Sequence, residues 1–337
     1  MVILGIETSC DDTSIGIVDV QRGRFVVREN CTASQVLIHR KYGGVVPEVA
    51  AREHALTILP TITTAMKRAK VTWKNIDRIA VTAGPGLHTA LLVGVEAART
   101  LSWLHNIPVV AINHIEGHVI SALANRSARD ISFPAVALVV SGGHTELISV
   151  PKLGTYKLIG KTIDDAVGEA FDKTAKVLGL PYPGGPEISR QATAGDATKF
   201  SFPRALPQKD NLSFSYSGLK TSVLYAWQKE KRHNSKLVQD ICASFQEAAL
   251  DPIISKTKQA MIQQGATTLL LGGGVAANAR LRQRLEEMIQ TLPNTKLLRP
   301  EPSLCTDNGA MIAIAGAMAK KMTPWKHLDA NPSWELV

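Results

Sequence analysis

The sequence predicts an α/β protein of two lobes, each built on a mixed β-sheet. Short apolar runs typical of strands alternate with longer segments of helical periodicity along the chain. A strand–turn–strand pattern at the N-terminus returns at 134–150, which indicates a weak internal duplication. The length of 337 residues is large for a single hydrophobic core. We therefore expect lobe I at 1–130 and lobe II at 131–312, with a last helix at about 313–337 that returns to lobe I.

Lobe I begins with the stretch VILGIETSCDDTSIGIVDV, in which a polar turn separates two apolar strands. Residues 54–69 have helical spacing, and IDRIAVTAGPG is a strand that runs into a glycine loop. HTALLVGVEAARTLSWLHN then predicts a helix, and IPVVAIN predicts a buried strand. This alternation is what an α/β lobe requires.

Lobe II opens with the second hairpin, PAVALVVSGGHTELISV. The stretch 182–222 is rich in Pro, Gly and Ser and predicts long functional loops. One or two helices at LVQDICASFQEAALDPIISKTKQAMIQQ, a strand at TTLLLGGG and a helix at VAANARLRQRLEEMIQ follow. Two lobes opened by hairpins, with glycine loops at strand ends, indicate a nucleotide cleft between the lobes.

Composition restricts the class of protein. No apolar run reaches the ~18 residues of a membrane span, and the N-terminus has no basic region or cleavage site of a secretory signal. The four cysteines show no CxxC spacing, so we expect no disulfide framework and a reducing, cytoplasmic location. The net charge of +9 permits a polyanionic partner such as nucleic acid, although each basic cluster could equally be a solvated helix face.

Three glycine loops together favour a nucleotide-like ligand. VSGGHTEL offers consecutive backbone N–H groups that could hold an anion, or it is an ordinary hairpin turn. LLLGGGVAANARLR places glycines before a helix N-terminus, with Asn278 either facing a ligand or capping the helix. TAGPGLHTALLVG has the same strand–loop–helix order. None of the three has the GxGxxG or P-loop pattern.

The segment HIEGH places two histidines one helical turn apart. His114 and His118 share a face of the predicted helix and could chelate a divalent metal, or be polar residues at a helix end that Asn113 caps. The HExxH protease pattern is absent, because Ile115 follows the first histidine. A helix N-terminus disfavours a cation unless a carboxylate offsets its partial charge. Asp307 could supply that carboxylate or cap the last helix.

Further carboxylates lie in two places. Asp11 and Asp12 fall in the turn of the first hairpin. In the stretch IDDAVGEAFDK, the helical spacing of Asp165, Glu169 and Asp172 predicts one shared face. An exposed acidic helix face is the alternative to a functional role for these three residues.

Nine segments, in order along essentially the whole chain, resemble the tRNA N6-adenosine threonylcarbamoyltransferase family. They are GIETSCDDT, YGGVVPEVAAREH, TAGPGL, HIEGH, VSGGHTEL, DDAVGEAFDKTAKVLGLPYPGGP, FSYSGLKT, GGGVAANARLR and CTDNGAMIA. The form YGGVVPE is similar to the bacterial branch. The resemblance implies the two-lobed actin-like ATPase superfold (sugar kinase and Hsp70 type), with mixed sheets and an interlobe cleft.

The resemblance also implies a reaction and its residues. The threonylcarbamoyl group of threonylcarbamoyl-AMP would pass to N6 of adenosine 37 in tRNAs that read codons beginning with A. A divalent metal, iron (Fe2+) or zinc, would be bound by His114, His118 and Asp307. Asp11 matches an acidic position implicated in activity, in a pair that is more commonly Asp-Glu in the family. The substrate-contacting positions would be Val139, Val140, Ser141, Gly142, Gly143, Asp172, Gly185 and Asn278.

Partners are implied by the same resemblance: tRNA, an inactive paralogue of the same fold, a small P-loop ATPase and a synthase that supplies the adenylate. No membrane partner is expected. Two other enzymes fit the superfold, namely a carbamoyltransferase with another acceptor and a sugar kinase or ATPase. A non-catalytic paralogue that only stabilises a partner is a third alternative. This chain retains His114, His118 and Asp307, and the family's inactive paralogue lacks the histidine pair.

Overall fold

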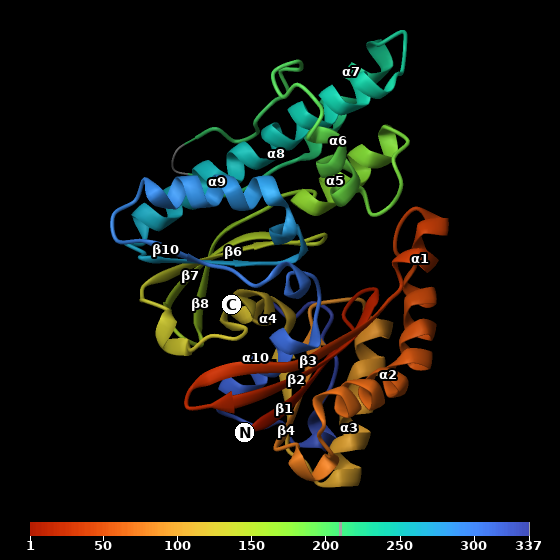
Figure 1. Ribbon diagram of the computed structural model, residues 1–337, viewed down its shortest axis with the longest axis vertical. Helices are drawn as coiled ribbons and strands as arrows, with labels where there is room; N and C mark the ends of the chain where they lie inside the picture. Colours follow the sequence, from red (N-terminus) through yellow and green to blue (C-terminus); the bar gives the residue numbers. More distant parts are fainter. Residues whose placement is uncertain (209–210, 337) are drawn as a thin grey trace. The chain divides into compact units, whose positions relative to one another are not determined.

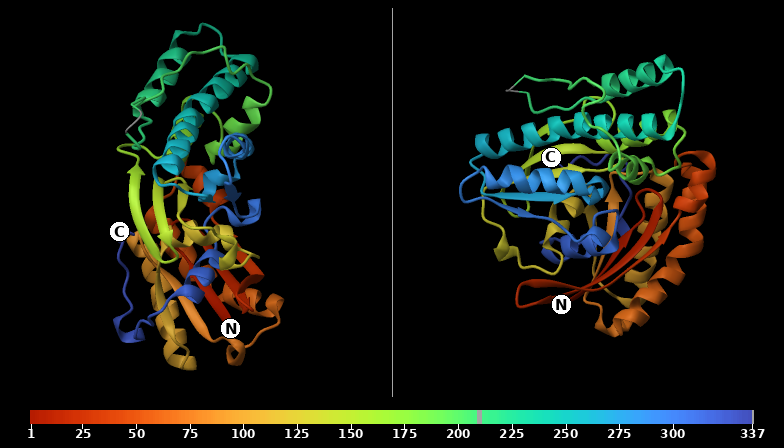
Figure 2. Two further views of the ribbon diagram at one scale, coloured as in Figure 1. Left: turned by 90° about the vertical axis from the view of Figure 1, so that its left-hand side faces the viewer. Right: turned by 45° about the horizontal axis from the view of Figure 1, so that its top comes forward.

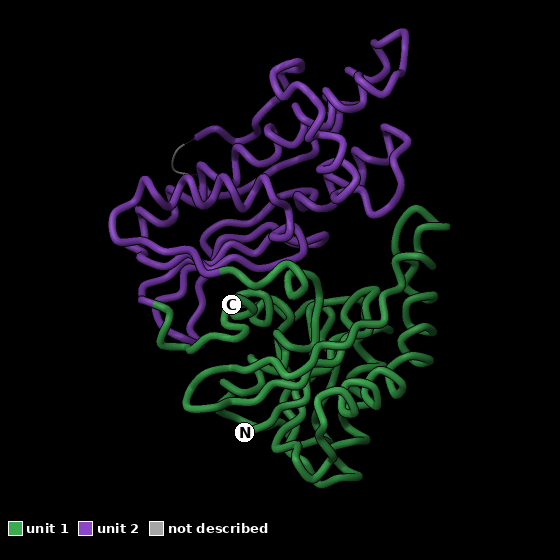
Figure 3. Tube along the Cα trace, in the orientation of Figure 1, with its two compact units in different colours: residues 1–131, 299–337 green, residues 132–298 purple. Residues whose placement is uncertain are grey.

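The computed structural model describes residues 1–208 and 211–336 and divides into two compact units (Figure 3). Unit 1 comprises Met1–Ile131 and Arg299–Val337, and unit 2 comprises Ser132–Leu298. The last long helix, α10, spans Gly309–Met318 in unit 1, so it begins before the expected helix and ends well before its expected end.

Unit 1 contains a five-stranded sheet in the order β3-β2-β1-β4-β5 (Figure 1). The first three strands are antiparallel neighbours, whereas β1 pairs parallel with β4 and β4 with β5. The predicted N-terminal hairpin is confirmed by the pairing of β1 with β2. The strands are β1 (Val2–Glu7), β2 (Asp12–Gln21), β3 (Arg24–Ser34), β4 (Arg78–Gly84) and β5 (Val109–Asn113).

Helices cover both faces of this sheet because successive strand residues point to opposite sides. The large side chains of β1 and β2, Leu4, Ile6, Ile15 and Ile17, pack into the core with α2 and α3. On the opposite face, the paired Gly5 and Gly16 lie against α10. The helices of the first segment are α1 (Val36–His39), α2 (Pro47–Ala69), α3 (His88–His105) and α4 (His114–Ile120).

Gly16 permits the close approach of α10 to the sheet, so we expect Gly16→Ala to destabilise the protein. A Cβ at Gly16 would lie 2.2 Å from the backbone N of Ala310. Backbone cannot yield as a flexible side chain can, so the expected loss of unfolding free energy is at least ~2 kcal/mol. Urea unfolding measures it. Gly218→Ala is the control, because nothing lies within 4 Å of that added Cβ. Equal stability of both variants would contradict the packing argument.

Unit 2 repeats the topology of unit 1. Its sheet has the order β10-β9-β6-β7-β8, in which β6, β7 and β8 are antiparallel neighbours and β6, β9 and β10 pair in parallel. The predicted duplication is therefore present in both sheets. Each unit adds a third antiparallel strand that the apolar pattern did not predict. The strands are β6 (Ala135–Val140), β7 (Thr145–Lys152), β8 (Thr155–Lys161), β9 (Thr268–Gly272) and β10 (Lys296–Leu298).

The helices of unit 2 correct one prediction. The stretch 182–222 contains α6 and the start of α7, so it is not loop throughout. The expected one or two helices are a single one, α8, which continues through Pro252 and packs beside α9 (Figure 2). Within the described residues, no helix combines the length and the apolar character needed to cross a membrane. The helices are α5 (Val167–Val177), α6 (Gly184–Ala192), α7 (Ser217–Lys229), α8 (Ser235–Gln263) and α9 (Ala279–Gln290).

Candidate functional site

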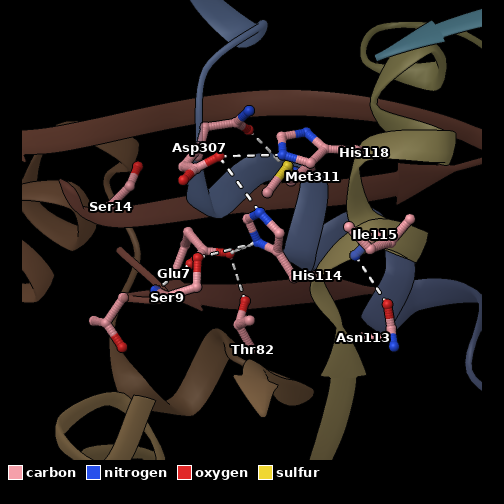
Figure 4. A network of polar contacts seen from close by, with 12 residues as sticks. Glu7, Ser9, Ser14, Thr82, Asn113, His114, Ile115, His118, Asp307 and Met311 are labelled. Atoms are coloured by element: carbon pink, nitrogen blue, oxygen red, sulfur yellow. Dashed lines mark hydrogen bonds and ion pairs between the residues drawn. The ribbon is translucent and has the colours of Figure 1, made fainter. Parts of the chain in front are cut away.

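His114, His118 and Asp307 converge inside unit 1 (Figure 4). Oδ1 of Asp307 lies 3.1 Å from Nε2 of His118 and 3.6 Å from Nε2 of His114. Potential ligand atoms of all three residues lie within 4.8 Å of one another. Both histidines are buried, and Asp307 is partly exposed. The spacing of HIEGH thus places two imidazoles on one face, as predicted, and the fold adds the carboxylate.

Local structure explains why these side chains meet. Asn113 caps α4, since its side-chain oxygen accepts hydrogen bonds from two backbone N–H groups of the first turn. Asn308, and not Asp307, caps α10, so the carboxylate of Asp307 is available to the histidines. Gly117 lets α4 approach α10, because a Cβ there would lie 2.9 Å from Cδ1 of Ile312.

Glu7, at the end of β1, contacts His114 on the ring nitrogen that faces away from Asp307. This residue was not predicted from the sequence. Its carboxylate Oε2 lies 3.0 Å from Nδ1 of His114 and accepts a 2.6 Å hydrogen bond from the hydroxyl of Thr82. Its Oε1 accepts a 2.5 Å hydrogen bond from the backbone N–H of Ser9. Glu7 is fully buried. A carboxylate on the second nitrogen of a histidine is the usual way in which a metal-binding imidazole is oriented.

The charges of this group depend on one another. Burial lowers the pKa of His114, but Glu7 and Asp307 outweigh it and raise that pKa to about 9. Burial and the neighbouring His114 lower the pKa of His118 below its usual value. Burial opposes ionisation of Glu7, yet His114 holds the pKa of Glu7 below its ordinary range. At neutral pH the metal-free centre therefore combines a neutral His118 with a protonated His114 beside an ionised Glu7.

The residues fit a divalent cation. Nδ1 of His118 is buried and has no hydrogen-bond partner among the described residues, whereas its Nε2 faces Oδ1 of Asp307 at 3.1 Å, so the nitrogen and the oxygen that would bind the ion already lie together. The partial positive charge at the N-terminus of α4 disfavours a cation, but Glu7 and Asp307 together balance the two positive charges of a divalent ion. Two imidazoles and one carboxylate are a ligand set that both iron(II) and zinc accept, and three protein ligands leave coordination positions open for a substrate.

Asp11 and Asp12 lie at the turn into β2, also in unit 1. Burial, followed by the charge of Asp307, raises the pKa of Asp11. Burial raises the pKa of Asp12 to about 7, although the hydroxyl of Ser34 acts in the opposite direction. The Oδ1 atom of Asp12 is buried without a hydrogen-bond partner among the described residues. Asp12 is therefore poised to exchange a proton near neutral pH.

We expect Asp12→Asn to change how stability depends on pH. Between the unfolded pKa of 3.8 and the folded pKa of about 7, folded Asp12 holds a proton that the unfolded chain lacks. Its contribution to stability therefore falls as pH rises through this window, and the amide cannot ionise. The variant should gain on the order of 1–3 kcal/mol relative to wild type between pH 5 and pH 8. Urea unfolding of metal-free protein at both pH values tests this, and parallel pH profiles would contradict it.

In unit 2, the first predicted substrate loop joins β6 to β7. Val139 and Val140 are fully buried strand residues. Ser141 closes the turn, since its backbone N–H bonds to His144 and its hydroxyl accepts from the His144 backbone. Gly142 is exposed, and a Cβ there would meet nothing within 4 Å. Gly143 is likewise exposed with free space around it, so the backbone at the tip of the loop is accessible to a ligand.

A second glycine loop lies beside the first because β6 and β9 are parallel neighbours, with Val139 opposite Gly272. Gly273 has a φ of 91°, and a Cβ there would lie 2.2 Å from the carbonyl oxygen of Val140. Only glycine accommodates both the positive φ and the close approach of the Val140 carbonyl. Two glycine loops at the carboxyl ends of adjacent parallel strands lie where ligands usually bind in such sheets.

The remaining predicted contacts also belong to unit 2. Oδ1 of Asp172 accepts a 2.7 Å hydrogen bond from the backbone N–H of Gly184, next to Gly185. Asn278 caps α9, and its amide nitrogen donates to Ser189 and to Gln246. The helix-cap alternative for Asn278 is thus present in the structure. The role of Asn278 toward a substrate remains a prediction.

The predicted helix face of Asp165, Glu169 and Asp172 is formed only in part, because α5 contains Glu169 and Asp172 but not Asp165. Asp165 precedes α5 and is held by Lys173 and Lys220, while Glu169 also pairs with Lys173. Asp172 instead faces the start of α6. The error concerns the start of the helix: the predicted helix includes Asp165, whereas α5 begins only at Val167.

The comparisons with known structures define the class of protein. A full-length HypF in its phosphate- and nucleotide-bound form superposes with a TM-score of 0.61 and 13% identity, over 94% of this chain and 45% of that chain. This likeness shows the fold alone. Together with the two five-stranded mixed sheets of one topology, it confirms the predicted actin-like ATPase superfold.

Sequence relatives define the family. The family model for tRNA N6-adenosine threonylcarbamoyltransferase matches residues 26–314. The enzyme of that name from Geotalea daltonii is 46% identical over 100% of this chain and 97% of its own length. Its counterpart from Bacillus cereus is 45% identical over 99% of this chain and 96% of its own length. The chain belongs to the tRNA N6-adenosine threonylcarbamoyltransferase family, which confirms the resemblance found in its motifs.

Proposed function

We propose that this protein transfers a threonylcarbamoyl group from threonylcarbamoyl-AMP to N6 of adenosine 37 in tRNAs that read codons beginning with A. Membership of the family supports this reaction. The single observation in the structure that carries it is the buried group of His114, His118 and Asp307. A paralogue that only binds a partner has no need of such a centre.

The chemistry is an acyl transfer. The N6 amine of the adenosine attacks the carbamoyl carbon, a new C–N bond forms, and the bond from carbon to the phosphate oxygen breaks. AMP leaves with the electron pair of that bond. Asp11 is our candidate acceptor for the proton that N6 loses, since its raised pKa brings it closer to the operating pH. AMP is a good leaving group, so orientation of the amine supplies much of the acceleration.

We propose that His114, His118 and Asp307 bind one divalent metal, iron (Fe2+) or zinc. When bound, the metal would hold and polarise the threonylcarbamoyl group and offset negative charge, without redox chemistry. Glu7 would orient the ring of His114 through Nδ1, which leaves Nε2 as its ligand atom. Support for this assignment comes from the ligand types and from the convergence of their potential ligand atoms within 4.8 Å of one another.

In unit 2, the glycine loops that follow β6 and β9 are our candidates to hold the adenylate moiety. Backbone N–H groups around Gly142 and Gly143 can bind phosphate oxygens, since no Cβ obstructs them. We propose Asp172, Gly185 and Asn278 as further contacts. For Asp172 and Asn278 this requires an exchange or sharing of the hydrogen bonds that they make to protein.

The partners follow from the same proposal. The net charge of +9 supports binding of tRNA through its phosphates. We also propose a cytoplasmic location, an inactive paralogue of the same fold, a small P-loop ATPase, and a synthase that supplies the adenylate. The free state of all four cysteines is consistent with a reducing compartment.

Product formation tests the proposal directly. Purified protein with the partner proteins, threonylcarbamoyl-AMP and an unmodified tRNA transcript should yield threonylcarbamoyl-adenosine, detected by mass spectrometry of the digested tRNA. A transcript with guanosine at position 37 is the matched control and should yield none. Consumption of the adenylate without product on either transcript would instead favour a carbamoyltransferase with another acceptor.

A further inference from the structure

A short protruding segment of unit 1, residues 36–44, combines cations with exposed apolar surface. It consists of α1, a 3-10 helix over Arg40–Tyr42, and Gly43 with Gly44. Arg40 and Lys41 are exposed, the side chain of Tyr42 is 58% exposed, and that of Leu37 is 70% exposed. The segment therefore presents two large apolar side chains beside two cations.

The base of this 36–44 segment is fixed by buried polar contacts, so the exposed side chains are displayed from a defined position. His39 is fully buried, and its Nε2 lies 3.0 Å from Oε1 of Gln35. The backbone N–H of Val46 donates to Nδ1 of His39 at 3.3 Å. Gln35 in turn donates its side-chain N–H to the carbonyl of Ala50 in α2. The segment is anchored at both ends.

The same anchor connects the segment to the proposed proton acceptor. The backbone N–H of Gln35 donates a 3.2 Å hydrogen bond to the carbonyl oxygen of Asp11. His54, on α2, accepts at Nδ1 from the side-chain N–H of Gln35 and donates from Nε2 to the carbonyl oxygen of Cys10 at 3.0 Å. A ligand held by the 36–44 segment would therefore lie close to the turn that carries Asp11.

We propose that the 36–44 segment is a contact surface for the anticodon loop of tRNA, with Tyr42 stacked on an unpaired base and Arg40 and Lys41 on phosphates. This inference rests on the proposed function and assigns the RNA surface within it. Unstacked RNA bases are recognised by aromatic rings, and flanking cations hold the backbone. A Cβ added at Gly43 or Gly44 would meet nothing within 4 Å, so RNA can approach the main chain there.

Two other basic clusters fit this role less well. Arg280 and Arg284 are paired with Glu247, so part of their charge is already compensated. Lys67 lies near the opposite end of the 23-residue helix α2, about 30 Å away along its axis. Between Val36 and Pro47 the sequence has no acidic residue, so the segment itself carries a net positive charge.

Equilibrium binding of a fluorescent anticodon stem-loop, measured over a range of salt concentrations, tests the proposal. Tyr42→Ala should weaken binding roughly 5- to 150-fold, whereas Tyr42→Phe, which keeps the ring, should stay within about twofold. Arg40→Ala with Lys41→Ala should lower the slope of log K against log salt by about 1.4 in magnitude, as expected for two lost phosphate contacts with single-stranded RNA.

Matched controls use the same unit. Lys67→Ala with Lys74→Ala removes two exposed cations far from the segment, and Trp103→Ala removes an aromatic side chain that is 62% exposed. Both controls should bind the stem-loop like wild type, and all variants are compared at equal folded fraction by circular dichroism. In the complete transfer assay, Tyr42→Ala should raise KM for tRNA and leave KM for threonylcarbamoyl-AMP unchanged.

The outcomes separate this inference from the function on which it rests. If wild type modifies tRNA and the Tyr42 and Arg40–Lys41 variants bind RNA like the controls, the segment is not an RNA surface, although the transferase stands. If those variants keep RNA affinity but lose assembly with the partner proteins, the segment docks a protein and the inference is equally wrong. A wild type that neither binds nor modifies tRNA would overturn the proposed function first.

Discussion

A variant with both His114→Ala and His118→Ala should purify without the divalent metal and lose at least about a thousandfold in transfer rate. The double substitution leaves Asp307 as the one remaining member of the three-residue ligand group. A single carboxylate does not retain a transition metal against buffer and chelator. Lewis-acid stabilisation is worth several kcal/mol, and each 1.36 kcal/mol corresponds to a tenfold change in rate, which gives the expected loss.

Metal content and transfer are to be measured on the same preparation, with partner proteins and donor in excess. His88→Ala is the matched control, since His88 lies exposed at the start of α3 in the same unit and outside the centre. The control should keep both metal and activity. A double variant that lacks metal but modifies tRNA at the normal rate would make the histidine pair structural and would refute the proposed role of the metal.

The sequence predicts the parts of this centre that are local and leaves open those that depend on distant contacts. The spacing of His114 and His118 determines that they share one face, because helical periodicity is a local property. Their meeting with Asp307 depends on the packing of α10 against β1 and β2 at Gly5 and Gly16, which no spacing reveals. The charge argument offers Asp307 as one possible carboxylate, and only the motif resemblance assigns it as a ligand.

The sequence does contain a signal for Glu7, which is an acidic residue within an apolar strand. It is the only charged residue in the run VILGIE, and a buried strand rarely carries an unpaired acid. A partner therefore had to exist, although its identity could not be derived from the sequence alone. The third strands were missed for the opposite reason: β3, with the sequence RFVVRENCTAS, is polar and only partly buried, so its hydrophobic pattern is weak.

The largest effect that we expect away from the metal ligands is at Glu7. Glu7→Gln preserves the shape of the side chain but replaces the carboxylate at 3.0 Å from Nδ1 of His114 with a neutral amide. One negative charge is lost from the centre, and the ring is oriented less strongly. Metal affinity should therefore fall 10- to 100-fold, the range seen when the hydrogen-bond partner of a metal-binding histidine is removed.

Competition against a chromophoric chelator measures this affinity without any enzyme assay, and the visible spectrum of the cobalt(II) form reports the geometry of the ligands. Thr82→Val is the matched control, because it removes the 2.6 Å hydrogen bond to Glu7 while the carboxylate remains beside His114. If Glu7 acts by orienting and charging the imidazole, Glu7→Gln changes the cobalt spectrum and affinity much more than Thr82→Val does. If it only satisfies buried donors such as the N–H of Ser9, both variants lose stability while metal affinity per folded molecule stays that of wild type.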